Sequence, residues 1–496
     1  MSNIEIKNLT FGYQEALIFD HAQINMDKKW RLGLVGRNGR GKTTLLKLLS
    51  GALKTETLKT IKENFVYFPQ DIKGKSSLLT LELLYECASF EQWKLERELK
   101  LLEVSIELLW HPFESLSGGE QTKCLLALLF LEEGNFPLID EPTNHLDLES
   151  RKTVADYLKK KSGFIVASHD RQFLDEICDH ILVIERKQIL LHQGNFSTYE
   201  EQKKLRDAFE LFEDEKLKKD ISRLKKTARE KEKWSKNLEM TKSRKKRGFD
   251  TETKRIDKGF LGRKAANMMQ KSKNLENRMN EEIEQKEKLL KNLEKIDDLS
   301  LNFFPDFHKV LVSCEDFTLG YDHDLFEPIH FKLERGQRLV LSGKNGTGKS
   351  SIVKVIKGIF DGQIKGKLEV VSSLQISYVD QMPQHQGTLR DFAGENHIEI
   401  ETFYSHLRKL GMERSVFDQT IETMSQGQQK KVELAKSLAQ KAQLYVWDEP
   451  LNYLDVFNHE QIITLIKTFS PSMLIIEHDA AFIEALGENN INLIKK

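Results

Sequence analysis

One ordered set of short motifs occurs twice in this chain of 496 residues, and this repeat limits the possible folds more than any other feature. Each set opens with a stretch that fits G-x-x-x-x-G-K-[ST], at residues 36–43 and 343–350. An apolar, strand-like run precedes each stretch, and a helix-like run follows it. Strand, loop and helix in this order place backbone N–H groups around phosphate oxygens at a helix N-terminus. A chance glycine turn is the alternative, and the repetition argues against it.

The rest of each set also carries phosphate chemistry. In both halves an apolar strand ends in Asp-Glu, which places the Asp beside a metal ion and the Glu where it can polarise an attacking water. A His at the end of the next apolar strand can contact the γ-phosphate. Taken singly, these would be a solvated turn and an ordinary strand-end residue; the ordered set favours catalysis. The candidates are Asp140, Glu141 and His169 in the first set, and Asp448, Glu449 and His478 in the second.

Together these motifs resemble the ATP-binding cassette (ABC) superfamily. Its P-loop, Gln-loop, LSGGQ signature, Walker B carboxylates, D-loop and His switch match residues of both halves in order. The D-loop matches Leu146-Asp147 in the first half and Leu454-Asp455 in the second. The resemblance implies an α/β fold with two ABC-type P-loop ATPase domains, and it implies ATP and Mg²⁺ as cofactors. Tyr13 and Tyr321 precede their P-loops where cassettes carry an adenine-stacking aromatic; a core tyrosine is the alternative.

The family pattern carries over to named positions. It implies that the signature loop of each domain completes the site of the other domain within one monomer. The residues implied for ATP binding are Tyr13, Gly36, Asn38, Gly39, Gly41, Lys42, Thr43, Thr44, Gln70, Ser117, Gly118, Gly119, Tyr321, Gly343, Asn345, Gly346, Gly348, Lys349, Ser350, Ser351, Gln381, Ser425, Gly427 and Gln428. Those implied for Mg²⁺ are Thr43, Gln70, Asp140, Ser350, Gln381 and Asp448. Gln426 replaces the usual glycine of the second signature, which puts the competence of the site around Lys42 in doubt.

Composition excludes several classes of protein. The longest uninterrupted apolar run, residues 124–131, is too short to span a bilayer. The N-terminus lacks a basic region followed by an apolar one, so no signal peptide is expected. Four scattered cysteines without C-x-x-C predict reduced thiols, no zinc site and a cytoplasmic protein.

The net charge of zero hides a basic segment between the two motif sets. Residues 221–280 hold 20 Lys and Arg against 7 Asp and Glu. Basic residues interleaved with aromatics and glycine favour binding to a nucleic-acid backbone. A nuclear-localisation signal or a solvated helix surface is the alternative.

The same segment has helical spacing of its apolar residues. They recur mostly every three, four or seven positions from Leu205 to Ala228 and again from Met268 to Ile296, and no proline interrupts residues 143–304. Gly248, Gly259 and Gly262 lie between the two runs. We therefore expect a long antiparallel α-helical hairpin with its turn within residues 242–263. A plain coiled-coil spacer is the alternative.

Paired cassettes joined by a basic helical hairpin resemble the ABC-F translation factors, and among them the Lsa type of resistance protein. The resemblance implies binding to the 70S ribosome in the E site, contact with 23S rRNA and P-site tRNA, and protection against lincosamides, streptogramin A and pleuromutilins. The implied domains are residues 1–200 (ABC ATPase 1), 201–305 (hairpin linker) and 306–496 (ABC ATPase 2). The hairpin tip that would approach the RNA and the drug site comprises Arg244, Lys245, Lys246, Phe249, Phe260 and Leu261.

Three other functions remain open. A housekeeping ABC-F factor differs only subtly, although the short stretch between Gln70 and Ser117 leaves no room for the arm that many housekeeping members carry, and the chain ends soon after His478. A soluble subunit of an ABC transporter would not need a basic hairpin. In ATPases of DNA repair or chromosome organisation, the coiled coil is normally inserted within a cassette, and here both cassettes are uninterrupted.

Overall fold

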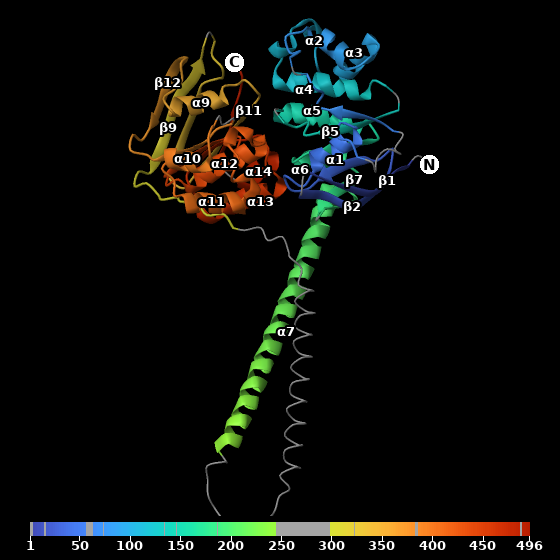
Figure 1. Cartoon of the computed structure of the whole chain (residues 1–496). Helices are drawn as coiled ribbons and strands as arrows, with labels where there is room; N and C mark the ends of the chain where they lie inside the picture. The colour runs from blue at the N-terminus through green and yellow to red at the C-terminus, as the bar shows by residue number, and fades with distance from the viewer. Residues whose placement is uncertain are drawn as a thin grey trace, which may run out of the picture. The chain divides into compact units, whose positions relative to one another are not determined.

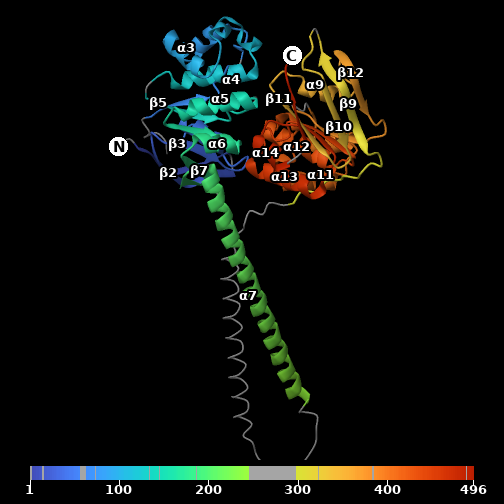
Figure 2. The same cartoon turned by 180° about the vertical axis from the view of Figure 1, so that it is seen from behind.

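The computed structural model describes residues 3–13, 16–55, 63–72, 74–132, 134–144, 146–185, 187–244, 298–321, 323–381, 385–486 and 489–496. The chain divides into two compact units, Met1–Tyr199 with Ile296–Lys496, and Glu200–Lys295. The first unit contains both copies of the sequence repeat (Figures 1 and 2). We call its two parts the N-terminal half, up to residue 199, and the C-terminal half, from residue 298.

The N-terminal half is built on a six-stranded sheet of order β4-β5-β6-β3-β7-β8, next to the antiparallel pair β1-β2. Its elements are β1 (Asn3–Tyr13), β2 (Ala16–Asp27), β3 (Arg31–Val35), α1 (Lys42–Leu49), β4 (Asn64–Phe68), α2 (Thr80–Cys87), α3 (Gln92–Leu101), η1 (Ile106–Trp110), η2 (Phe113–Ser115), α4 (Gly118–Ala127), η3 (Leu128–Phe130), β5 (Asn135–Asp140), α5 (Leu148–Lys159), β6 (Phe164–Ala167), α6 (Arg171–Ile177), β7 (His180–Glu185) and β8 (Gln188–Gln193).

The C-terminal half repeats this plan with a five-stranded sheet of order β13-β14-β15-β11-β16 and a three-stranded sheet of order β10-β9-β12. Its elements are β9 (Val310–Gly320), β10 (Ile329–Glu334), β11 (Arg338–Gly343), α9 (Lys349–Ile356), β12 (Gln363–Val370), β13 (Ile376–Val379), α10 (Leu389–Glu395), α11 (Ile400–Lys409), η4 (Arg414–Val416), η5 (Ile421–Thr423), α12 (Gln426–Ala439), β14 (Leu444–Asp448), α13 (Val456–Phe469), β15 (Met473–Ile476), α14 (Ala480–Leu486) and β16 (Asn489–Leu493).

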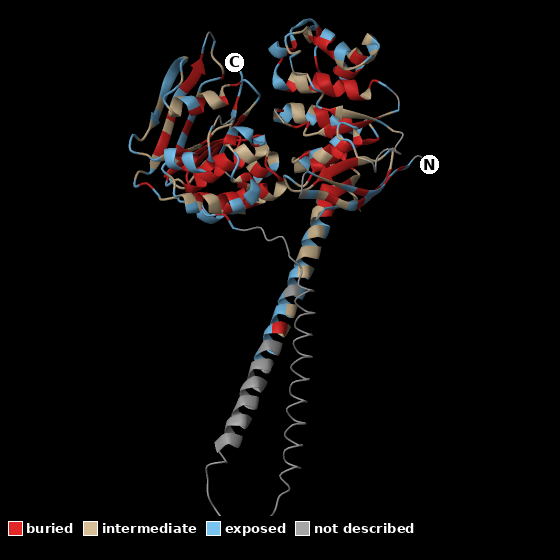
Figure 3. Cartoon of the chain, viewed as in Figure 1, coloured by how far each residue is buried: buried red, intermediate tan, exposed pale blue. Residues whose placement is uncertain are grey.

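The central strands are buried and parallel, which is why they appear in the sequence as continuous apolar runs. Every residue of β6 and of β15 is buried, and Figure 3 shows the buried residues concentrated in the sheets and the helices beside them. In each half the strand before the P-loop, the strand ending in Asp-Glu and the strand before the His are neighbours. The carboxyl ends of parallel strands meet at one edge of a sheet, so these three motifs share that edge. The α/β fold with a duplicated ATPase domain is confirmed.

Helix α7 (Phe196–Arg244) starts in the first unit and continues into the second. This agrees with the first arm of the predicted hairpin. Phe196 and Tyr199 in its first turn are buried, whereas Leu205 is exposed. The second arm and the turn lie outside the described residues. Of the helices in the described part of the chain, none is long and apolar enough to span a bilayer.

Candidate functional site

The P-loop of each half turns between a strand and a helix through a left-handed glycine. Gly41 has φ +98°, and a Cβ there would lie 2.5 Å from Ile18 Cγ2, so only glycine fits. The Lys42 ammonium donates to the Gly36 carbonyl (2.8 Å) and to Asn38 Oδ1 (3.2 Å). These bonds hold the lysine across the mouth of the loop, where a phosphate would contact it.

The C-terminal P-loop has the same build. Gly348 has φ +88°, and Lys349 donates to the carbonyl oxygens of Gly343 (2.9 Å) and Lys344 (2.8 Å). Burial lowers the pKa of Lys42 and of Lys349, and the nearby Walker B carboxylates oppose that shift. Both lysines therefore lie in partly dehydrated positions, where an anionic ligand gains most from their charge.

The carboxylates after β5 and β14 sit on unusual backbone. Glu141 has φ +52° and Glu449 has φ +45°, which is rare for residues other than glycine. In each case the backbone N–H donates to the last carbonyl of the neighbouring strand, at 2.8 Å to Ala167 and 2.9 Å to Ile476. Strained residues of this kind persist where surrounding structure holds them, and they cluster at functional sites.

The two carboxylates differ in their side-chain partners. Glu141 Oε1 lies 3.2 Å from His169 Nε2, whereas the matching distance from Glu449 to His478 is 3.9 Å. Glu449 Oε2 instead accepts from Gln381 Nε2 (2.8 Å) and from the Asn452 amide. The two sites are thus alike in sequence and unlike in hydrogen bonding.

Burial also sets the protonation of these groups. It raises the pKa of Glu141 to about 8, with Lys42 opposing and Asp140 adding to the shift. Burial lowers the pKa of His169 well below its ordinary value and that of His478 to about 3. Both histidines are therefore neutral at pH 7, so each can donate one N–H while accepting at its other nitrogen.

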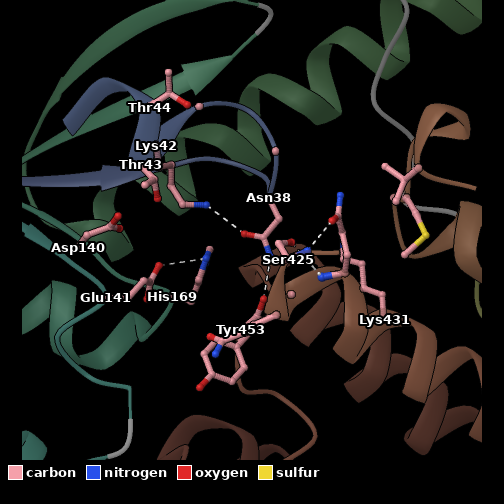
Figure 4. A pocket seen from close by; sticks show the side chains of 18 of the residues that line it. Asn38, Lys42, Thr43, Thr44, Asp140, Glu141, His169, Ser425, Lys431 and Tyr453 are labelled. Atoms are coloured by element: carbon pink, nitrogen blue, oxygen red, sulfur yellow. Dashed lines mark hydrogen bonds and ion pairs between the residues drawn. The ribbon is translucent and has the colours of Figure 1, made fainter. Parts of the chain in front are cut away.

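A cavity of about 680 Å³ around Lys42, here called site one, is lined by both halves. The N-terminus of α12 lines it with Ser425 (Figure 4). The Ser425 side chain caps this helix in a capping box with Gln428. The Asn38 N–H donates to Asp455 Oδ2 (2.9 Å), and its amide donates to the Tyr453 carbonyl (2.8 Å). The D-loop of one half therefore holds the P-loop of the other.

The reciprocal cavity, site two, encloses about 460 Å³ around Lys349. Here the Asn345 N–H donates to Asp147 Oδ2 (3.1 Å), and Lys344 pairs with Glu149. Gly118, at the start of α4, lines the cavity from the N-terminal half. The head-to-tail arrangement implied by the sequence is present at both sites.

The structure brings most predicted site residues to these cavities. Site one is lined by Tyr13, Asn38, Gly39, Gly41, Lys42, Thr43, Thr44, Asp140, Glu141, His169, Ser425, Gln426, Gly427 and Gln428. Site two is lined by Gly118, Tyr321, Asn345, Gly346, Gly348, Lys349, Ser350, Ser351, Gln381, Glu449 and His478. Outside the two linings are Gly36, Gln70, Ser117, Gly119, Gly343 and Asp448.

Gln70 is the clearest difference from the sequence-based expectation. Its amide donates to the Leu125 carbonyl of α4 (3.2 Å), which keeps it from the ATP cavity, whereas Gln381 reaches Glu449 in site two. The Gln70 amide is thus bonded to a carbonyl of α4 and not to a Walker B carboxylate. Sequence spacing could not show this choice.

Tyr67, Asn144 and Lys431 are among the residues of site one that sequence reasoning missed. The Tyr67 hydroxyl donates to Asp140 Oδ2 (3.0 Å), and Lys431 and Asn144 line the cavity. The repeat indicated two of them. Tyr67 and Tyr378 each lie three positions before the Gln of the Gln-loop, and Asn144 and Asn452 each lie four positions after the Walker B Asp.

The oxygen atoms at the Walker B ends suit a hard cation. Asp448 Oδ1 is buried without a hydrogen-bond partner among the described residues, and the Ser350 hydroxyl bonds the same carboxyl group. Thr43 and Asp140 line site one together. Hydroxyl and carboxylate oxygens are the ligands that Mg²⁺ prefers, so these four residues fit it.

The predicted tip contributes little to the described structure. Arg244 is the last residue of α7. Lys245, Lys246, Phe249, Phe260 and Leu261 lie outside the described residues.

Comparison with known proteins agrees with this geometry. A family model described as ABC transporter matches residues 19–144 and 326–452, just over half of the chain. The chain belongs to the ABC transporter family. Its two ABC domains bind ATP and hydrolyse it to ADP and phosphate, as the sequence predicted.

Relatives extend over almost the whole chain. The ribosome protection protein VmlR of Bacillus subtilis is 27% identical over 97% of this chain and 85% of its own length. The energy-dependent translational throttle protein EttA of Mycobacterium tuberculosis is 25% identical over 97% of this chain and 89% of its own. The ATP-binding protein Uup of Caulobacter vibrioides is 27% identical over 96% and 74%. These relatives are ABC-F proteins, so that resemblance is confirmed; the Lsa type stays a prediction.

A solved structure of similar fold is the archaeal ribosome recycling factor aABCE1 in complex with the ribosomal stalk protein aP1. Its TM-score is 0.62 at 20% identity, over 99% of this chain and 88% of that chain. The RNase-L Inhibitor has a TM-score of 0.58 at 21% identity, over 94% and 86%. At this identity the likeness supports the fold alone.

Proposed function

We propose that this ABC ATPase protects ribosomes from antibiotics. ATP bound at sites one and two seals the two halves, and the sealed protein binds the 70S ribosome at the E site. The observation that carries the proposal is the pair of composite sites, each closed by a D-loop carboxylate from the opposite half. The relative VmlR, which is named a ribosome protection protein, supports ribosome protection as the function.

In the proposed reaction, each ATP is bound by the P-loop of one half and is enclosed by the signature helix of the opposite half. Lys42 or Lys349 contacts the β- and γ-phosphates, and the N-terminus of α12 or α4 faces the γ-phosphate. Mg²⁺ would be held by Thr43 and Asp140 in site one and by Ser350, Asp448 and Gln381 in site two, where it would neutralise phosphate charge.

Hydrolysis would use the strained carboxylates. Glu141 and Glu449 orient the attacking water, and the neutral His169 and His478 donate a hydrogen bond toward the γ-phosphate. Tyr13 and Tyr321 are about half exposed in the described structure and line the cavities, which leaves their rings free to stack on adenine. Loss of the γ-phosphate then opens the seal.

The linker would carry the protective action. We propose residues 201–305 as its extent, between ABC domains at 1–200 and 306–496. Its basic residues would contact 23S rRNA and P-site tRNA, and its tip would approach the peptidyl-transferase centre. The drugs displaced would be lincosamides, streptogramin A and pleuromutilins.

A housekeeping translation factor is the second candidate. Its support is the relative EttA, a translational throttle protein, which matches the chain over nearly the same extent as VmlR. Both functions need ATP-dependent ribosome binding, so drug protection alone separates them.

The deciding experiment measures minimum inhibitory concentrations with and without expression of the protein. Lincomycin, tiamulin and a streptogramin A should each need at least about fourfold more drug, a change of roughly 0.8 kcal/mol in effective affinity. Erythromycin and linezolid serve as comparison drugs. If the minimum inhibitory concentrations of the first three drugs did not change, resistance would be excluded and the housekeeping function would be favoured.

The clamp is tested separately with Glu141→Gln and Glu449→Gln combined. This variant keeps Lys42, Lys349 and the cation ligands, so it should bind ATP, fail to hydrolyse it and pellet with ribosomes. Loss of pelleting in the presence of ATP would contradict the clamp.

A further inference from the structure

The first turn of α7 is fastened to α6, the short helix that starts directly after the His169 loop of site one. The Ser197 backbone N–H donates to Asp175 Oδ1 (2.6 Å), and the Ser197 hydroxyl bonds the other oxygen of that carboxylate. Phe196, the first residue of α7, is 4% exposed. The first N–H groups of a helix have no partner within it, so Asp175 caps α7 from a neighbouring element. We call residues 196–199 the root of α7.

The other end of α6 reaches the opposite half of the protein. Arg171, the first residue of α6, donates from Nη2 to Glu460 Oε1 (2.9 Å) and to the Val456 carbonyl (3.3 Å), both on α13. Its guanidinium carbon stands 6.0 Å from the ring centroid of Phe196, at the outer limit of a cation–π contact. A single side chain therefore touches α13 of the C-terminal half and the root of α7.

The internal repeat provides a comparison for this arginine. Both halves place a helix after a His-Asp pair, α6 after residues 169–170 and α14 after residues 478–479. The position of Arg171 is occupied by Ala480 in the C-terminal half. The arginine thus occurs in the half that α7 follows, and the fold of the cassette itself does not need it.

We propose that Arg171 is a positioning residue that couples the sealing of the two halves to the root of α7. In the sealed protein Glu460 and Val456 hold the guanidinium against Phe196, so the root is fixed at both ends of α6. When the halves part, Arg171 is separated from both acceptors, and α7 keeps only the contacts of its root within the N-terminal half, those to Asp175 and Asn195 among them. This inference rests on the proposed sealing by ATP and not on ribosome binding.

Amide hydrogen exchange of the full-length protein tests the coupling. The parent carries Glu141→Gln and Glu449→Gln so that ATP with Mg²⁺ persists. Residues 194–204 report the root, and residues 424–431, which complete site one from the opposite half, report sealing. In the parent ATP should slow exchange at both, severalfold at the root. In Arg171→Ala, ATP should slow exchange at the root by less than about twofold. Exchange at residues 424–431 should still be slowed nearly as much as in the parent.

Three further variants exclude a general loss of structure. Glu460→Ala removes the carboxylate acceptor but leaves the Val456 carbonyl, so it should reproduce most of the effect of Arg171→Ala. Arg171→Lys keeps the charge but not the planar fork, so it should recover part of the slowing. Glu86→Ala removes an ion pair on the surface of the N-terminal half, to Lys75, without touching α6 or either site, and should behave as the parent.

Three results would overturn the coupling. The first is Arg171→Ala with the full ATP-dependent slowing at the root, and the second is Glu86→Ala with the same loss as Arg171→Ala. If the parent shows slowing at residues 424–431 and none at the root, sealing stands and the coupling is wrong. If the sealing segment itself does not respond to ATP, the proposed clamp fails first.

Discussion

At the scale of single residues, the two sites differ most in what holds the carboxylate after the Walker B aspartate. Glu449 is held by Gln381 and Asn452, while Glu141 contacts His169 and its Gln70 faces α4. Gln426 lines site one where a glycine was expected. Each difference favours site two as the faster site.

Single substitutions should expose this asymmetry. Replacing a catalytic base costs roughly 10²–10⁴-fold at its own site, so each variant reports the turnover of the other site. We expect Glu449→Gln to remove more than half of the steady-state ATPase rate of the purified protein, and Glu141→Gln less than half. Equal losses would show that Gln426 and Gln70 do not slow site one.

Glu477 is a buried carboxyl in the place of Ser168 of the other half. Its Oε1 accepts from the N–H groups of His478 and Asp479, and burial raises its pKa to about 8, with Asp479 and Glu449 adding to the shift. The folded protein keeps this proton at pH values where the unfolded chain, near pKa 4.5, has released it. The stability contribution is therefore full below about pH 4.5 and falls as pH rises through 8.

The variant Glu477→Gln should remove that pH-dependent decline. We expect the melting temperatures of the variant and the parent to be most alike near pH 5. Up to pH 8 the variant should melt at increasingly higher temperature than the parent, by roughly 2–4 °C for each kcal/mol of stability that the parent loses. Thermal scans of both proteins across this range make the measurement, and other titrating groups cancel in the comparison. Parallel pH profiles would mean that Glu477 is ionised in the folded protein.

At the scale of elements, each D-loop aspartate serves two structures at once. Asp147 caps α5 by accepting from the Ser150 N–H (2.9 Å), and its other oxygen accepts from the Asn345 N–H of the opposite P-loop. Asp455 has the same pair of roles at α13 and Asn38. Helix capping and sealing thus share one carboxylate in each half.

Two substitutions of Asp147 separate these roles. Serine is a good N-cap but too short to reach Asn345, so Asp147→Ser should raise the ATP concentration for half-maximal activity about tenfold without destabilising α5. Asp147→Ala should add about 1 kcal/mol of destabilisation to the same ATP effect. ATP titrations and melting curves give both quantities. If Asp147→Ser showed the same ATP dependence as the parent, the bond between Asp147 and Asn345 would not contribute to sealing.

At the scale of the whole molecule, charge is divided between the parts of the chain. The net charge of zero includes the basic surplus of residues 221–280, so the remaining residues carry an equal acidic surplus. Ribosome association should therefore depend on the linker, since acidic ATPase domains are repelled by RNA phosphates.

Charge reversal at Arg244, Lys245 and Lys246 tests this division. Replacing all three with Glu should weaken ATP-dependent ribosome pelleting, and the dependence on log salt should fall by about 0.7–0.9 for each RNA phosphate that the linker no longer neutralises. As a control, Phe249→Ala or Phe260→Ala with Leu261→Ala keeps every charge and should pellet as the parent. Those apolar variants should lower resistance if the tip acts at the drug site. Full resistance in every tip variant would assign protection to tRNA displacement.

The sequence by itself determined the motif order, the two P-loop turns, the strand ends that carry Asp-Glu and His, and the start of a long helix after the first domain. These features depend on local chemistry: a left-handed glycine, a buried apolar run or a missing proline acts over a few residues. Only the tertiary structure decided which atoms meet. Asn38 and Asp455 are 417 positions apart, Gln70 faces α4 rather than its expected ligand, and Arg171 joins α13 to α7. Such partners are chosen by packing of distant segments, on which local spacing carries no information.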